Sequence, residues 1–162
     1  MLIIKMRLNI LIAGKAGEGP NFLSRVISKG LFNKGYYVFN SRLYRSLIRG
    51  GINFNQISVS ESFLGSNDSK VDLFVALSKE ALEEHKDSLN TNGIALSPSS
   101  EELEKSNAYC AGKVWKTLGL DFKSLDKEFK NIGKKYEENV KDAKEGFNSV
   151  EEKIQLEKTM TG

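Results

Sequence analysis

The 162-residue chain has the composition of a globular protein, with 40% hydrophobic residues, 28% charged residues and a formal net charge of +3. This length fits one domain that is large enough to bury a core. No apolar run approaches the roughly 20 residues that span a bilayer, so no membrane segment is expected. The single cysteine, Cys110, excludes an internal disulfide and a four-cysteine iron–sulfur cluster, and it fits a cytoplasmic protein.

The charges are divided unevenly along the chain. Residues 1–60 contain nine Lys or Arg residues and one acidic residue, whereas residues 61–162 contain 15 basic and 20 acidic residues. This asymmetry predicts an anionic ligand or partner for the first part, although a solvated basic surface would also explain it. Nucleic acid is not the expected partner, because no nucleic-acid-binding module surrounds the short basic stretch.

The first elements have the pattern of a βαβ unit. Residues 8–13 form a short apolar run that predicts a buried parallel strand. Residues 21–33 carry apolar side chains three and four positions apart, which predicts an amphipathic helix, and Gly35 stands where a helix-ending glycine is expected. The aromatic and β-branched residues of 36–41 predict the next strand.

Strands and helices continue to alternate. Residues 54–60 alternate between apolar and polar side chains, which predicts a strand with one solvated face. Residues 71–77 and 93–97 read as further strands, and the charged stretch 79–89 between them reads as a helix. This order predicts an α/β fold, namely a Rossmann-like open and mostly parallel sheet with helices on both faces.

The remaining chain is predicted to be helical. Apolar residues recur at steps of three and four from Phe122 to Ile154, and Gly133 and Gly146 are expected to divide this stripe into separate helices. We therefore expect a single domain over 1–162, with an α/β sheet core over 1–97 and a helical C-terminal part over 98–162.

The first candidate site is the glycine-rich turn "GKAGEGP" at 14–20. Its spacing resembles both dinucleotide and P-loop fingerprints, but Pro20 and Asn21 replace the lysine and hydroxyl residues that an NTPase needs. NAD is disfavoured because Asn40-Ser41-Arg42 stands where a ribose-binding acid is expected, and Arg42 leaves only an NADP-like ligand open. The turn either binds an anion at a helix N-terminus or only connects strand to helix. The candidate ligand residues here are Gly14, Lys15, Gly17 and Gly19.

The second candidate site is the basic stretch "SRLYRSLIRGG" at 41–51. Its arginines are three and four positions apart, so they share a face if the stretch is helical, and guanidinium groups bind phosphates or carboxylates in pairs of hydrogen bonds. This stretch and the glycine turn both follow strands of a parallel sheet, so they are expected to converge on one anion, either the phosphates of CoA or an acidic partner surface. The candidate residues are Arg42, Arg45, Arg49, Gly50 and Gly51.

No catalytic residue and no metal site are assigned. The only histidine, His85, lies among charged residues of a predicted helix, and the sequence has no Ser–His–Asp set, HExxH motif or paired cysteines.

Several stretches together resemble one enzyme family. They are "IAGKAGEG" at 12–19, "SLIRGG-N" at 46–53, "KVDLFVALSKEALEEH" at 70–85, "NAYCAGKVWKTLGLD" at 107–121 and "NVKDAKEGF" at 139–147. In this order they resemble the gamma subunit or gamma domain of the 2-oxoacid:ferredoxin oxidoreductases, and most closely the form that is fused to the N-terminus of an alpha subunit.

The resemblance implies a component of an oxidoreductase that acts on the oxo group of its donor, such as pyruvate or ketoisovalerate. These enzymes decarboxylate a 2-oxoacid to an acyl-CoA and pass electrons to ferredoxin. Thiamine diphosphate, Mg²⁺ and Fe–S clusters are expected in the alpha and beta partner chains, with no cofactor in this chain and CoA as a possible ligand. The chain is expected to be cytoplasmic, oligomeric and inactive alone. A free-standing Rossmann-like module that binds an NADP-like nucleotide is the alternative.

Overall fold

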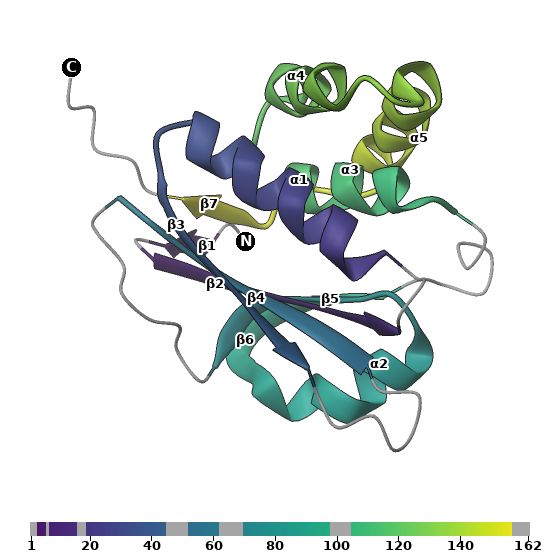
Figure 1. The fold of residues 1–162 in the computed structure, drawn as a ribbon. Coiled ribbons are helices and arrows are strands. Elements are labelled where there is room, and N and C mark those ends of the chain that lie inside the picture. Colours follow the sequence, from purple (N-terminus) through teal and green to yellow (C-terminus); the bar gives the residue numbers. More distant parts are fainter. Residues whose placement is uncertain are drawn as a thin grey trace.

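The computed structural model describes residues 3–5, 7–15, 19–44, 52–61, 70–97 and 105–156. Its centre is a five-stranded sheet with the strand order β3-β4-β2-β5-β6 (Figure 1). The strands are β2 (Arg7–Lys15), β3 (Tyr37–Tyr44), β4 (Ile52–Ser60), β5 (Val71–Ala76) and β6 (Leu89–Leu96). All five lie where the sequence predicts strands, with boundaries shifted by a few residues.

Four of the five strands run in the same direction. β2, β5 and β6 pair in parallel, whereas β4 is antiparallel to both of its neighbours, β2 and β3. The predicted open and mostly parallel sheet is therefore confirmed. Only seven residues separate the end of β3 from the start of β4, which is shorter than a parallel crossover needs, so the two strands pair in opposite directions and β4 is reversed.

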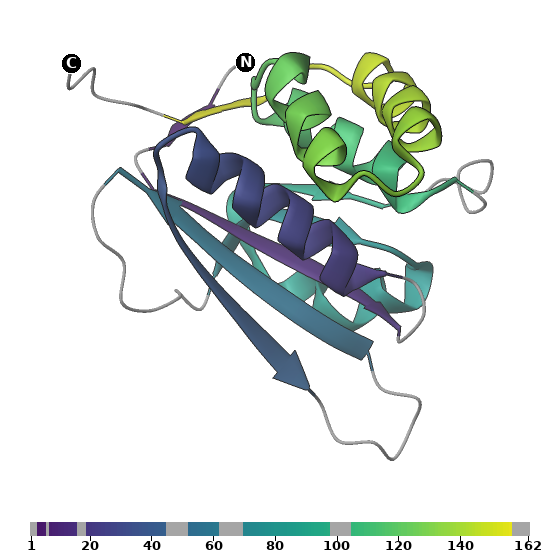
Figure 2. The same cartoon turned by 45° about the horizontal axis from the view of Figure 1, so that its top comes forward.

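Helices cover both faces of this sheet, as predicted (Figures 1 and 2). One face carries α1 (Pro20–Asn33), α3 (Asn107–Thr117), α4 (Phe122–Ile132) and α5 (Tyr136–Asn148). The other face carries α2 (Lys79–His85), followed by a short 3₁₀ helix, η2 (Lys86–Ser88). Each layer of helices closes its own cluster of buried apolar side chains against the sheet.

Because helices cover both faces of the sheet, β4 does not have the solvated face that the sequence predicts. The predicted solvated face is wrong, because β4 is a central strand and even its polar residues Asn55 and Ser58 are fully buried. Ser58 keeps a hydrogen-bond partner there by donating from Oγ to Oδ1 of Asn9 on β2, at 2.6 Å. The polar positions of this strand thus satisfy each other inside the sheet instead of facing water.

Helix α1 begins and ends at glycines. Gly19 precedes it with φ 87°, and Gly35 follows it with φ 97°. At the C-terminal end, the amide of Gly35 donates to the carbonyl of Phe32 and that of Tyr36 to the carbonyl of Leu31, at 3.0 and 3.3 Å. These two bonds form a Schellman motif, so the predicted role of Gly35 is confirmed.

The C-terminal part differs from its prediction in two places. Gly133, with φ 75°, ends α4 as expected, but Gly146 lies inside α5 and is buried. A Cβ atom at Gly146 would overlap the carbonyl oxygen of Tyr109, and one at Gly112 would overlap that of Ala143. These glycines therefore bring α3 and α5 into close contact, and that contact outweighs the low helix propensity of glycine.

The second difference is a strand in the region predicted to be helical. Residues Ile154–Leu156 form β7, which pairs in parallel with β1 (Ile3–Lys5) beside the main sheet. Ile154 and Leu156 are buried while Gln155 between them is exposed, which is the two-residue period of a strand. The last apolar residue of the predicted helical stripe therefore belongs to a strand.

Candidate functional site

The N-terminus of α1 has no side-chain cap. Gly19 occupies the N-cap position in a left-handed conformation and offers no side chain, and the first turn of the helix carries no acidic residue. Pro20 has no N–H to satisfy, but the amides that follow it still point out of the helix end. A helix that begins without a capping side chain has partial positive charge available for an anion.

A second helix begins against the same turn. The side chain of Asn107, the first residue of α3, occupies the space that a Cβ at Gly19 would need. The N-terminus of α3 itself is capped, because Ser106 Oγ accepts from the amide of Tyr109 at 3.4 Å and donates to Asp142 at 2.7 Å. The amide side chain of Asn107 therefore lies beside the uncapped end of α1. Sequence reasoning did not identify Asn107 as a site residue, and the Ser-Asn pair before a helix was its only signal.

Beneath the start of α1 lies a buried amide. Asn55 on β4 is fully buried and donates from Nδ2 to Oδ1 of Asn21, at 3.2 Å. Within the described part of the chain, Oδ1 of Asn55 has no hydrogen-bond partner. A buried acceptor without a donor costs free energy, so this oxygen is a natural partner for a ligand hydroxyl or amide N–H.

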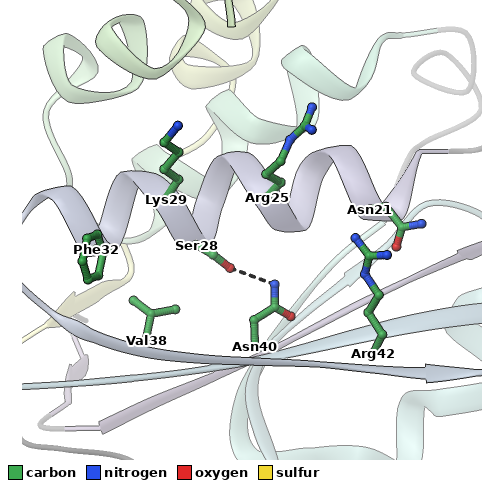
Figure 3. Close-up of a pocket in the computed structure, with 8 residues that line it drawn as sticks. All are labelled: Asn21, Arg25, Ser28, Lys29, Phe32, Val38, Asn40 and Arg42. Carbon is green, nitrogen blue, oxygen red and sulfur yellow. Dashed lines mark hydrogen bonds between the residues drawn. The ribbon is translucent and has the colours of Figure 1, made fainter. Parts of the chain in front are cut away.

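Arg42 on β3 extends toward this end of α1. Arg42 and Asn21 line the same open cavity of about 390 Å³ between α1 and β3, and Figure 3 shows the Arg42 side chain rising from the strand beside Asn21. Arg42 pairs with Asn55 in the β3–β4 register. The structure therefore brings Arg42 close to the N-terminus of α1, although Arg42 lies in a strand and not in a helix that carries three arginines on one face.

Lys15 is placed differently from Arg42. It is the last residue of β2 and forms an ion pair with Glu80 in the first turn of α2, on the opposite face of the sheet. Gly14 precedes it in β2, opposite Asn53 of β4. The other predicted ligand residues, Gly17, Arg45, Arg49, Gly50 and Gly51, lie outside the described residues.

Asn40 contributes to the fold at this edge. Its Nδ2 donates to Ser24 Oγ at 2.8 Å and to Ser28 Oγ at 3.2 Å, which ties β3 to α1. Asn40 occupies the place where a dinucleotide-binding protein carries a ribose-binding acid, and here its amide is already engaged.

The described residues show neither a metal site nor a membrane span. No group of three or more His, Cys, Asp or Glu side chains among them could hold a metal ion, and none of the described helices has the length and hydropathy to cross a bilayer.

The fold is shared with solved proteins of one kind. A 2-oxoglutarate:ferredoxin oxidoreductase from Magnetococcus marinus, with 2-oxoglutarate, coenzyme A and succinyl-CoA bound, is similar with a TM-score of 0.71 and 23% identity, over 89% of this chain and 30% of that chain. The gamma subunit of a keto/oxoacid ferredoxin oxidoreductase from Geobacter sulfurreducens has a TM-score of 0.70 and 17% identity, over 87% of this chain and 96% of that one. A pyruvate oxidoreductase subunit from Thermotoga maritima has a TM-score of 0.65 and 15% identity, over 89% and 97%.

The sequence is also similar to longer chains. The alpha subunits of the 2-oxoacid:ferredoxin oxidoreductases of Sulfolobus sp. and Sulfurisphaera tokodaii are 30% and 29% identical to it over 80 residues, which is 49% of this chain and 13% of each relative. The match thus spans about an eighth of the length of these relatives. The sequence profile of the pyruvate ferredoxin/flavodoxin oxidoreductase family matches residues 9–134, which run from β2 past the end of α4. The chain therefore belongs to the pyruvate ferredoxin/flavodoxin oxidoreductase family.

Proposed function

We propose that this chain is the gamma component of a 2-oxoacid:ferredoxin oxidoreductase, an enzyme that converts a 2-oxoacid to an acyl-CoA and passes electrons to ferredoxin. The observation that carries the proposal is the family match over 9–134, together with a fold that covers nearly all of a solved gamma subunit. In this proposal the chain works only in a complex with alpha and beta components, in the cytoplasm.

The redox chemistry is assigned to the partner chains. Thiamine diphosphate with Mg²⁺ would supply carbanion stabilisation there, and Fe–S clusters would carry electrons. This chain has a single cysteine, whereas an Fe–S cluster needs several thiolate ligands. Its own residues would bind and orient a ligand and would contact the other components.

We infer that the ligand is CoA, held by its phosphates at the start of α1. The uncapped amides after Gly19 would donate to a phosphate, and the Arg42 guanidinium can reach the same end of the helix. Oδ1 of Asn55 would then accept from a hydroxyl or an amide N–H, both of which CoA carries. Each such charge-assisted contact is worth about 0.5 to 3 kcal/mol. The Magnetococcus enzyme, whose structure contains coenzyme A, supports this choice of ligand.

The alternative of a free-standing NADP-like nucleotide module is not favoured. The family match assigns the chain to an oxidoreductase family whose curated relatives are named as subunits. Asn40, which stands in place of the ribose-binding acid, has no charge, and its Nδ2 already donates to Ser24 and Ser28.

The CoA role is tested in the assembled enzyme with Arg42→Ala and Gly19→Ala. Arg42 is exposed, so its loss leaves the fold intact, and it should raise the KM for CoA about tenfold with little change in the KM for the 2-oxoacid. An alanine at Gly19 would displace Asn107 and strain a left-handed residue, and should act in the same direction. Lys141→Ala, on the exposed side of α5, is the matched control. Unchanged KM values for CoA in both variants would exclude the start of α1 as the CoA site.

A further inference from the structure

The groove between α1 and β3 extends beyond Arg42, the one groove cation that the proposed CoA contacts use. Its eight lining residues come from α1 and from the α1-facing positions of β3, and they include three cations and no acid; they are Asn21, Arg25, Ser28, Lys29, Phe32, Val38, Asn40 and Arg42 (Figure 3). Arg25 and Lys29 make no hydrogen bond or ion pair with any other described residue. Positive side chains without partners around one groove favour an anionic occupant.

The other end of the groove is apolar. Phe32 and Tyr37 are the two large hydrophobic side chains that are strongly exposed among the described residues, at 65% and 49%. Phe32 lies in the last turn of α1 near Val38 on β3 (Figure 3), whereas Tyr37, which precedes Val38 on the strand, points to the other face of the sheet and does not line the groove. An exposed aromatic side chain next to unpaired cations is typical of a protein contact rather than of a site for a small anion.

β3 also has a strand neighbour on one side only. It lies at the edge of the five-stranded sheet and pairs with β4 alone within the described residues. An edge strand can accept a further strand through its main-chain N–H and C=O groups. From Val38 to Arg42 the edge runs about 13 Å, which matches about five residues of an extended segment.

We propose that the groove between α1 and β3 binds an extended acidic segment of a partner chain. The segment lies along β3, with an apolar side chain packed on Phe32 and Val38 (Figure 3). The charged ends of Arg25 and Lys29 point away from β3 in Figure 3, and these long, exposed side chains turn toward the carboxylates of the bound segment. The proposed role as a component of a complex supplies the reason for such a surface. The binding itself can be measured without any partner component.

The experiment uses the whole chain and a fluorescein-labelled peptide of the sequence Leu-Thr-Glu-Thr-Glu-Thr-Leu, in which both glutamates and both leucines face the same side when the peptide is extended. Fluorescence anisotropy at low salt should show saturable binding that falls as salt is added, and the same peptide with glutamine in place of glutamate should bind at least about tenfold more weakly. Arg25→Glu/Lys29→Glu should weaken binding of the acidic peptide about tenfold or more, and Phe32→Ser should weaken it severalfold.

The matched control is Lys123→Glu/Lys127→Glu, because these lysines are also exposed and four residues apart, on α4. This variant should bind the peptide as the unmodified chain does. Equal losses of peptide affinity in both double variants, or no saturable binding of the acidic peptide at low salt, would overturn the proposal. Binding of pyrophosphate that displaces the peptide and depends on Arg25 and Lys29 but not on Phe32 would overturn it too, since the groove would then be a site for a small anion. All these readouts are independent of oxidoreductase activity, so their failure leaves the proposed gamma role standing.

Discussion

At the scale of single residues, the contact between α3 and α5 depends on two glycines. Gly112 and Gly146 each face backbone atoms of the opposite helix. Backbone atoms, unlike the ends of flexible side chains, cannot move aside to make room for a Cβ atom. Gly146→Ala should lower the free energy of unfolding by about 1–3 kcal/mol, because the added methyl group forces the helices apart. Urea unfolding measures this change. Lys141→Ala, on the exposed side of the same helix, should change stability by less than about 0.5 kcal/mol. If Gly146→Ala left the free energy of unfolding unchanged, the two helices could move apart without loss of stability, which would contradict this prediction.

A second residue-scale prediction concerns acid stability. The Lys34 ammonium donates to Asp121 at 2.7 Å, and this hydrogen bond holds the pKa of the Asp121 carboxyl below its ordinary value of 3.8. A lowered pKa in the folded state means that the contribution to stability is present above about pH 4 and is lost as the pH falls below it. Because both side chains are partly exposed, the effect should stay below about 1 kcal/mol.

The variant Asp121→Asn distinguishes the effect of the negative charge from the effect of the helix cap. Asp121 also caps α4 by accepting from the amide of Ser124 at 3.2 Å, and asparagine caps helices equally well. Unfolding measured from pH 2 to pH 7 should therefore show the variant less stable near pH 7, with the difference shrinking as the pH falls below about 4. A constant difference across this range would mean that the ion pair does not contribute.

At the scale of elements, a chain of polar contacts joins four strands. Ser58 on β4 donates to the side chain of Asn9 on β2, the main-chain amide of Asn9 donates to Asp72 on β5 at 2.9 Å, and Asn90 on β6 donates to the same carboxylate at 2.9 Å. The Asp72 side chain is buried. It satisfies an amide near the start of β2, before the β2–β5 pairing that begins at Ile10.

Removing this carboxylate should weaken the whole sheet. Asp72→Ala leaves the amide of Asn9 buried without this acceptor, so the free energy of unfolding should fall by about 1–3 kcal/mol. Asp72→Asn keeps one acceptor oxygen and should cost less than the alanine variant. Asp87→Ala, on the exposed 3₁₀ helix, serves as the control in the same denaturant titration. Equal stability of Asp72→Ala and the control would contradict a structural role for the network.

Periodicity explains why most elements could be predicted and a few could not. The buried strands and α1 carry uninterrupted apolar patterns, so their positions follow from local sequence. The reversed direction and full burial of β4 depend on neighbours that are distant in the sequence, and alternation of polar residues alone indicates a solvated face. Gly146 reads as a helix breaker locally, and only the approach of α3 shows why it is retained inside a helix.

The candidate site was predictable only in part for the same reason. A glycine turn before a helix predicts an anion-binding end, and the structure places Gly19 at the N-cap of α1, while ligand binding there stays a prediction. Asn107 and Asn55 reach the same place from α3 and β4, and no local pattern connects them with the turn. The ion pair of Lys15 with Glu80 likewise joins residues that are 65 positions apart, since Lys15 ends β2 and Glu80 lies in the first turn of α2.

At the scale of the whole molecule, the described residues form one sheet with a layer of helices on each face. The helical layer on one face is held together by the α3–α5 contact, while the uncapped start of α1 and the groove along β3 remain available at the surface. Such an arrangement suits the proposed component, which positions a ligand and contacts partners.

The most direct test of the proposed function is reconstitution. Purified alpha and beta components are assayed for CoA-dependent reduction of ferredoxin with a panel of 2-oxoacids, with and without this chain. The proposal predicts no turnover by the chain alone, weak or absent turnover by the alpha–beta subcomplex, and full CoA-dependent activity with co-elution when the chain is added. Turnover of a 2-oxoacid by the isolated chain, or a fully active subcomplex that neither binds the chain nor responds to it, would contradict the proposed role.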